Sequence, residues 1–194
     1  MPAQDTAAPI VITGGAQRLG LAVATELRAE GHRVVITYRR ERPELDHLRE
    51  LGIETIAADF GTDDGPEALA KTLADRYPSL RALIHNASEW LPEGSRASDA
   101  EVLETMLRVH VRAPYLLNLA CGDLLLRHGE QAGYADIIHM SDYVASTGSR
   151  KHIAYAASKA ALDNLTLSFA SKYAPTSSAM ARKAAKSMVR GYAE

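Results

Sequence analysis

A tyrosine and a lysine stand four residues apart, at Tyr155 and Lys159. Four residues are about one turn of an α-helix, so the two side chains would share one helix face. An ammonium group beside a phenol stabilises the phenolate and lowers the pKa of the tyrosine. Such a tyrosine can donate a proton near neutral pH, and we therefore predict a general acid at Tyr155. This spacing is common by chance, so its weight depends on the motifs around it.

Residues 13–20 read TGGAQRLG and follow a short run of β-branched residues. Glycines between a strand and a helix permit a tight turn, and they let a pyrophosphate approach the helix N-terminus. We therefore predict a dinucleotide site that includes Gly14, Arg18 and Leu19. The usual G-x-G-x-x-G spacing is absent, so a glycine-rich turn without a ligand is the alternative.

The second predicted strand ends in Tyr38-Arg39-Arg40. Sheets that bind NAD usually carry an acidic residue at this place, which holds the ribose hydroxyls. Guanidinium groups instead suit a 2′-phosphate, to which they make charge-assisted and bidentate bonds. Together with Arg18 on the glycine turn, these residues predict NADP(H) in preference to NAD(H). The alternative is that Arg39 and Arg40 are ordinary solvated charges.

Short apolar runs alternate with longer amphipathic stretches along the chain. This alternation predicts a parallel sheet covered on both faces and, with right-handed crossovers, a doubly wound α/β fold. Its ligands should bind at the carboxyl ends of the strands, where the motifs above fall. The strands are expected at 10–13, 34–38, 53–58, 82–85 and 136–140, and the helices at 19–30, 43–52, 66–77, 99–111, 114–128 and 153–173, with 99–128 alternatively one helix interrupted near Pro114.

Composition restricts the remaining possibilities. The chain has 194 residues, a formal net charge of −2, 46% hydrophobic residues and a single cysteine, Cys121. These values predict one globular domain and give no electrostatic case for a nucleic-acid partner. One cysteine excludes an internal disulfide. Since the sequence shows neither a membrane-spanning apolar run nor a secretory leader, we expect a cytoplasmic protein without a membrane partner.

Three segments together, residues 13–20, Asn86-Ala87 and Tyr155 to Lys159, resemble the short-chain dehydrogenase/reductase family. The resemblance implies a Rossmann-like single domain and a nicotinamide-dependent oxidoreductase. It implies that Tyr155 is the acid, that Lys159 binds the nicotinamide ribose, and that Asp59 contacts the adenine. The full expected cofactor set is Gly14, Arg18, Leu19, Tyr38, Arg39, Arg40, Asp59, Phe60, Asn86, Ala87, Ser88, Tyr155 and Lys159.

Two departures from the common family pattern narrow the resemblance to the pteridine reductase branch. Arg18 stands where most members have glycine, and Asp142 stands where most have serine. The segment from His85 to Trp90 is also similar to that branch. The resemblance implies NADPH-dependent reduction of a dihydropterin, such as 7,8-dihydromonapterin and also dihydrofolate, by hydride transfer to C6 and protonation of N5.

This chemistry gives three further residues a task. A carboxyl group beside a phenol relays a proton better than a hydroxyl, so Asp142 is expected to be catalytic with Tyr155 and Lys159. Trp90 would stack on the flat pterin, and Ser88 would bond the cofactor phosphates or the pterin edge. The expected substrate-binding set is thus Trp90, Ser88, Asp142 and Tyr155. Alternatives stay open: Asp142 as a helix or turn cap, and Trp90 as plain packing.

Histidines give weaker signals. His110 lies where many family members have an asparagine that organises a water relay to the lysine, so a proton relay and a structural role both stay open. His85, His139 and His152 are scattered over three segments without ligand spacing, so we expect no metal site.

Beyond residue 175 the resemblance stops. We expect residues 1–175 to form the NADP-binding domain and 176–194 a basic helical tail, the remnant of the family's substrate-loop helix. The family's sixth and seventh strands are lacking, because the chain is truncated or because segments are missing from the sequence. The resemblance also implies a homo-oligomer, a tetramer or dimer, built on helices 112–128 and 153–173. A ketone-reducing enzyme and a non-catalytic NADP(H)-binding protein are the alternative functions.

Overall fold

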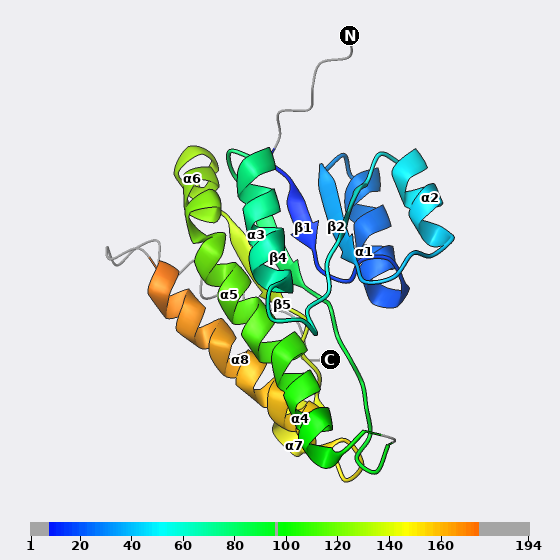
Figure 1. Ribbon diagram of the computed structural model, residues 1–194. Helices are drawn as coiled ribbons and strands as arrows, with labels where there is room; N and C mark the ends of the chain where they lie inside the picture. Colours follow the sequence, from blue (N-terminus) through cyan, green and yellow to red (C-terminus); the bar gives the residue numbers. More distant parts are fainter. Residues whose placement is uncertain (1–7, 96, 175–194) are drawn as a thin grey trace.

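The computed structural model describes residues 8–95 and 97–174, and its centre is a parallel five-stranded sheet (Figure 1). The strands lie in the order β3-β2-β1-β4-β5, the doubly wound arrangement expected from the sequence. Their bounds are β1 Ile10–Ile12, β2 Val34–Tyr38, β3 Glu54–Ala57, β4 Ala82–His85 and β5 Asp136–His139. All five predicted strands are present, each within two residues of its expected ends.

Alternate residues of the strands face opposite sides of the sheet, and both sides are buried. Val11 aligns with Val35 on one neighbouring strand and with Leu83 on the other, and all three belong to one apolar cluster. Ile12 aligns with Ile36 and belongs to the cluster on the other face. This two-sided burial explains why the strands read as continuous apolar runs.

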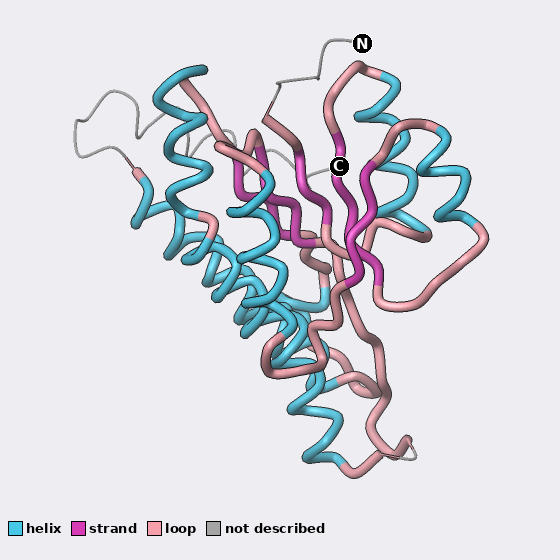
Figure 2. The backbone as a smooth tube through the Cα atoms, turned by 45° about the horizontal axis from the view of Figure 1, so that its top comes forward, coloured by secondary structure: helices cyan, strands magenta, loops and turns pink. Residues whose placement is uncertain are grey.

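Helices cover both faces of the sheet (Figure 2). The apolar cluster on one face includes residues of α1 (Arg18–Ala29) and α2 (Glu44–Glu50). The cluster on the other face includes residues of α3 (Gly65–Arg76), α5 (Ala113–Ala120) and α6 (Gly122–Ala132), and Tyr173 of α8 packs against it. Helix α8 (Ile153–Tyr173) begins near the carboxyl ends of the strands, beside α4 (Asp99–Leu107), and runs back along the sheet.

The segment between β4 and β5 is a nearly continuous helix with one widened turn. A π-helical turn, η1 (Arg108–Arg112), joins α4 to α5, and Cys121 separates α5 from α6. The widened turn ends two residues before Pro114, which has no N–H to donate and whose ring crowds the preceding carbonyls. It turns His110 into the interior, where the residue is 1% exposed.

One short helix was not foreseen. Helix α7 (Val144–Thr147) follows β5, and it is too short to leave a periodic pattern in the sequence. The predicted tail at 176–194 lies outside the described residues. Over residues 8–95 and 97–174, no helix is both long and apolar enough to cross a bilayer.

Candidate active site

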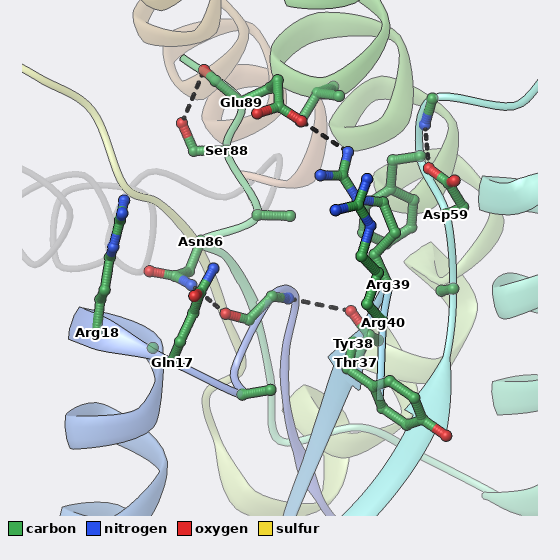
Figure 3. Close-up of a pocket in the computed structure, with 18 of the residues that line it drawn as sticks. Gln17, Arg18, Thr37, Tyr38, Arg39, Arg40, Asp59, Asn86, Ser88 and Glu89 are labelled. Atoms are coloured by element: carbon green, nitrogen blue, oxygen red, sulfur yellow. Dashed lines mark hydrogen bonds and ion pairs between the residues drawn. The ribbon is translucent and has the colours of Figure 1, made fainter. Parts of the chain in front are cut away.

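The carboxyl ends of β1 to β4 surround a cleft of about 230 Å³ (Figure 3). The sequence placed thirteen residues in a cofactor site, and the structure brings eleven of them to this cleft. Tyr155 and Lys159 are not among its lining residues. The eleven are Gly14, Arg18, Leu19, Tyr38, Arg39, Arg40, Asp59, Phe60, Asn86, Ala87 and Ser88.

The glycine turn packs directly against the loop that follows β4. Gly14 has a φ of +66°, and a Cβ atom there would lie 2.8 Å from the Cα of Ala87. The Thr13 hydroxyl accepts hydrogen bonds from the backbone N–H groups of Asn86 and Ala87, both at 3.0 Å. The Asn86 amide donates to the carbonyl oxygens of Thr13 and Gly14 at 3.0 and 2.9 Å. In this structure Asn86 therefore joins the two loops that form the floor of the cleft.

Arg18 begins α1 in a conformation that favours glycine. Its φ is +50°, and it is the only non-glycine residue with positive φ in the described part of the chain. A side chain in this region costs about 1–2 kcal/mol relative to the right-handed conformation. Arg18 rises along one side of the cleft, while Arg39 and Arg40 extend from the other side (Figure 3). Strain of this kind, at an exposed arginine beside a cleft, indicates a functional constraint.

Two acidic residues hold the end of β2, and neither contact was predicted from the sequence. The Arg39 guanidinium forms an ion pair with Glu89, with 2.6 Å between Nη1 and Oε2. The Tyr38 hydroxyl donates to the Glu41 carboxylate at 2.7 Å, and this bond raises the pKa of Tyr38. Thr37, one residue earlier, accepts the N–H of Gly14 at 3.0 Å and so ties β2 to the glycine turn.

Tyr155 donates a hydrogen bond to Asp142 across 3.0 Å. Burial raises the pKa of Tyr155 to about 12, and the bond and charge of Asp142 act in the same direction. The helical spacing of Tyr155 and Lys159 predicted a lowered pKa, and this direction is wrong. The Lys159 ammonium donates to the carbonyl oxygen of Met140 at 2.8 Å and lies 5.6 Å from the centre of the Tyr155 ring.

Lys159 is itself almost fully buried, with 4% of its surface exposed. Burial lowers its pKa to about 8, while the charges of Asp142 and Asp163 act to raise it. Asp142 also accepts the backbone N–H of Val144 at 3.1 Å through its other oxygen. The aspartate therefore serves as a turn cap and as the partner of Tyr155 at the same time.

His110 lies behind Tyr155 and connects it to the loop after β4. Its Nε2 accepts the N–H of Glu89 at 3.3 Å and lies 2.9 Å from the Ser88 hydroxyl. The proton of the neutral ring therefore sits on Nδ1, which lies 2.8 Å from the Ser158 hydroxyl. Ser158 in turn donates to the Tyr155 carbonyl at 2.7 Å. Burial lowers the pKa of His110 to about 3, so the ring is neutral at physiological pH.

Trp90 stacks on His152, with ring centres 4.2 Å apart, and 60% of its surface is exposed. This pair lies beside the start of α8, and the helix begins two residues before Tyr155. The Glu93 carboxylate accepts the N–H groups of Ile153 and Ala154 at 3.0 and 2.8 Å. The loop that carries Trp90 thus also caps the helix that carries Tyr155.

Two histidines that the sequence had weighed as metal ligands belong to a buried network. His85 Nε2 lies 2.7 Å from the Asn118 side-chain oxygen, and the Asn118 nitrogen lies 3.1 Å from His139 Nε2. His139 Nδ1 lies 2.8 Å from the Thr166 hydroxyl. Burial lowers the pKa of His85 to about 4 and that of His139 to about 3. Among the described residues, no group of three or more histidine, cysteine, aspartate or glutamate side chains is arranged to hold a metal.

Several site residues carried no recognisable signal in the sequence. Gln17, Arg42 and Glu89 line the cleft, and each is adjacent or close to a predicted residue. Glu93 lies in the loop that carries Trp90, and His152 lies directly before the helix that carries Tyr155. Their contacts join segments that are about 60 residues apart, which no local pattern reports.

Known proteins resemble this chain in sequence and in fold. The sequence pattern of the family described as "short chain dehydrogenase" matches residues 8–182. A dihydromonapterin reductase from Enterobacter sp. (strain 638) is 52% identical over 167 residues, which cover 86% of this chain and 69% of the relative. The dihydromonapterin reductase of Escherichia coli (strain K12) is 50% identical over the same shares of the two chains.

Solved structures show the same relationship. A crystal structure of alternative dihydrofolate reductase 1 (FolM) from Brucella suis, in complex with NADP, has a TM-score of 0.76 at 25% identity and covers 88% of this chain and 69% of that chain. A metagenomic short-chain oxidoreductase in complex with NADP has a TM-score of 0.73 at 28% identity and covers 85% of this chain and 76% of that chain. From the family match, these relatives and the arrangement of the site, we conclude that the chain belongs to the short-chain dehydrogenase/reductase family of oxidoreductases.

Proposed function

We propose that this protein reduces a dihydropterin with NADPH, converting 7,8-dihydromonapterin to tetrahydromonapterin, with dihydrofolate as a second substrate. Relatives about half identical to this chain carry the name dihydromonapterin reductase, which supports the substrate class. The single observation that carries the proposal is the hydrogen bond between Tyr155 and Asp142. It joins a carboxylate to the phenol that we propose as the proton donor for N5 of the pterin.

The cleft fits a 2′-phosphorylated dinucleotide. The close approach of Gly14 to Ala87 leaves no room for a side chain, so backbone lines the place where a pyrophosphate would lie. Arg18, Arg39 and Arg40 all line the same cleft and supply the cations that a 2′-phosphate needs. NADPH, when bound, supplies the hydride for C6. Asp59, Phe60, Asn86, Ala87 and Ser88 would hold its adenosine and middle parts, while Lys159 would bind the nicotinamide ribose.

The proton would pass from the Tyr155 hydroxyl to N5 of the substrate. Asp142 accepts the hydrogen bond of that hydroxyl and holds it in place. Transfer of the proton to N5 would leave a phenolate, which regains a proton from water, and Asp142 would pass that proton on because it lies beside the phenol oxygen. Lys159 holds its ammonium group 5.6 Å from the centre of the Tyr155 ring, and its proposed task is to bind the nicotinamide ribose beside the phenol. Asp142, Tyr155 and Lys159 are thus proposed as the catalytic residues.

Trp90 is proposed as the surface on which the pterin ring stacks. One of its faces lies against His152, while most of the side chain is exposed beside the start of α8. A flat heteroaromatic ring gains stabilisation from an offset or parallel aromatic partner. Ser88 is proposed to bond either the cofactor phosphates or the pterin edge.

We also propose that two or more copies associate through the long helices. Helices α5, α6 and α8 expose large apolar side chains, which contact with another protein surface would bury. These side chains are Tyr115, Leu119, Leu126, Ile153 and Leu167. A second copy of the chain is the proposed partner of these helices. In a two-fold symmetric dimer the same helices of both copies meet, so the apolar side chains of both copies are buried. Light scattering tests this point, and a monodisperse monomer contradicts it.

Steady-state NADPH oxidation, measured in parallel with dihydromonapterin, dihydrofolate and a set of ketones, tests the function. Turnover with dihydromonapterin, and weaker turnover with dihydrofolate, is the expected result. Turnover with ketones alone identifies a ketone reductase. NADPH binding without turnover on any pterin or ketone identifies a non-catalytic binding protein.

A further inference from the structure

The ion pair between Arg39 and Glu89 bridges the cofactor cleft. Arg39 follows β2 and Glu89 follows β4, so the bond joins loops that are 50 residues apart in the chain. Both residues line the cleft, and the bond crosses from one wall to the other (Figure 3). The carboxylate of Glu89 is therefore paired with the guanidinium that we propose to bind the 2′-phosphate of NADP(H).

This ion pair is one that a stronger anion can open. The Arg39 side chain is 44% exposed and that of Glu89 is 25% exposed, and ion pairs so accessible to water contribute little to stability. A phosphate monoester carries close to two negative charges and three acceptor oxygens, whereas a carboxylate carries one charge and two oxygens. A guanidinium binds both anions with the same fork of N–H donors. A phosphate beside Arg39 should therefore displace the carboxylate.

The backbone of Glu89 is held by a buried residue, whereas its carboxylate is held by the partly exposed Arg39. The Glu89 N–H donates to His110 Nε2, and the preceding residue, Ser88, lies within hydrogen-bond distance of the same nitrogen. His110 is buried and neutral. An exchange at Arg39 therefore needs only a rotation of the Glu89 side chain, and the loop that forms the cleft floor stays in place.

We propose that Glu89 is an internal competitor for the 2′-phosphate: its carboxylate holds Arg39 across the cleft, and a 2′-phosphorylated nucleotide displaces it. This inference rests on the proposed use of NADP(H). It makes Glu89 a residue that weakens cofactor binding and favours cofactor release, since the carboxylate reclaims the guanidinium as the phosphate leaves. A 2′-hydroxyl, which carries no charge, gains nothing from Arg39 in the exchange.

Calorimetric titration with two probes tests the competition without measuring turnover. The probes are adenosine 2′,5′-bisphosphate, which carries the 2′-phosphate, and 5′-AMP, which lacks it. Glu89→Gln keeps the shape and the backbone bond to His110 but removes the charge. We expect this change to tighten binding of the bisphosphate by about two- to fivefold, the range of an exposed ion pair, and to leave 5′-AMP unchanged. Glu104→Gln is the matched control, because Glu104 of α4 pairs with Arg108 of η1 and neither residue lines the cleft.

The Arg39→Gln background separates competition from simple repulsion. Arg39→Gln should weaken bisphosphate binding, and adding Glu89→Gln to it should then bring no further gain, because no guanidinium is left to release. An equal gain for both probes, a gain that persists without Arg39, or no gain at all overturns the proposal. If wild-type protein prefers NADPH to NADH while Glu89→Gln changes nothing, only the role of Glu89 fails. If wild-type protein binds neither NADPH nor the bisphosphate, the proposed cofactor fails with it.

Discussion

The hydroxyl of Tyr155 points its proton at Asp142, 3.0 Å away, and the second oxygen of the same carboxylate accepts the N–H of Val144. The bond to the backbone fixes the carboxylate, so its orientation toward the phenol does not depend on a bound ligand. Asp142 is therefore both a structural cap and the nearest charged partner of Tyr155. The two interpretations that the sequence left open are compatible, and variants can separate them.

Substitution of Tyr155 should lower the rate of catalysis, and substitution of Asp142 should change the pKa of Tyr155. Tyr155→Phe removes the proton donor, and we expect kcat for dihydropterin reduction to fall by about 100-fold or more. Asp142→Asn can still accept the Val144 N–H, so it keeps the cap while removing the charge. Because both the bond and the charge of Asp142 raise the pKa of Tyr155, this variant should lower that pKa from about 12.

Ultraviolet difference titration of phenolate measures this pKa directly. Tyr155→Phe supplies the reference spectrum in which the transition of Tyr155 is missing. Asp142→Ala should lose both the charge and the cap, so it should combine the pKa change with lower thermal stability. An unchanged phenol titration in Asp142→Asn, or near wild-type turnover in both Tyr155→Phe and Asp142→Ala, would contradict the assigned acid.

Arg18 offers a prediction in which stability and affinity change in opposite directions. Its φ of +50° is unfavourable for any side chain, so Arg18→Gly should relieve strain of about 1–2 kcal/mol, less about 0.5–1 kcal/mol for the extra freedom of glycine in the unfolded chain. The same change removes a cation from the cleft and should raise the KM for NADPH several-fold. Arg18→Ala is the matched control, because it loses the cation and keeps the strain.

Chemical denaturation and initial rates distinguish the two effects. Arg18→Gly and Arg18→Ala should show the same rise in NADPH KM, while only the glycine variant exceeds wild-type stability. If the alanine variant is as stable as the glycine variant, the strain at this position is negligible. If neither variant changes the KM, Arg18 has no part in cofactor binding.

Trp90 should affect the substrate and not the cofactor. Trp90→Ala removes the stacking surface, and we expect the KM for the dihydropterin to rise by about fivefold or more with little change in the KM for NADPH. His152→Ala leaves Trp90 in place but removes the ring stacked 4.2 Å from it, so it should raise the same KM by less. A change confined to the NADPH KM in either variant would show that the pterin does not stack there.

Strand positions were predictable because parallel strands are buried on both faces. Runs such as Val34 to Tyr38 are continuous apolar segments bounded by turn residues, and burial at that density leaves a pattern in the sequence. The widened turn η1 was not predictable from periodicity, since five residues of π-helix have nearly the composition of an α-helix. Pro114 marked an interruption in the right region, but the chain absorbs it by widening a turn and not by ending the helix.

The residues of the site also include some that were predictable from the sequence and some that were not. Residues next to a strand end, such as Arg39 and Asn86, were predictable because the fold rule places strand ends around the ligand. Partners brought in from distant segments were not: Glu89 meets Arg39 across 50 residues, and Ser158 meets His110 across 48. The direction of the Tyr155 pKa was wrong for a related reason. Helical spacing indicates that Lys159 is near Tyr155. It indicates neither the burial of Tyr155 nor its contact with the aspartate thirteen residues before it.

Three buried histidines should make the protein sensitive to mild acid. Burial lowers the pKa values of His85, His110 and His139 to about 4, 3 and 3, whereas the unfolded chain titrates near 6.5. Between pH 6.5 and about 4 the unfolded state therefore binds more protons than the folded state. Stability is fully present above pH 6.5 and falls as pH decreases, by about 1.4 kcal/mol per pH unit for each histidine.

Burial is the largest cause of the lowered pKa values, and the hydrogen bonds of two of the rings are consistent with a neutral imidazole. His139 Nε2 faces the Asn118 amide nitrogen and His110 Nε2 receives the Glu89 N–H, so a proton on either nitrogen would meet a donor. Urea unfolding between pH 7 and 5 measures the slope. His110→Asn should lower it by about one third relative to wild type, and so should His139→Gln, whatever each does to absolute stability. His47→Gln is the control, because the side chain of His47 is 67% exposed. Equal slopes in all four proteins would show that the buried rings take up protons in the folded state, as exposed histidines do.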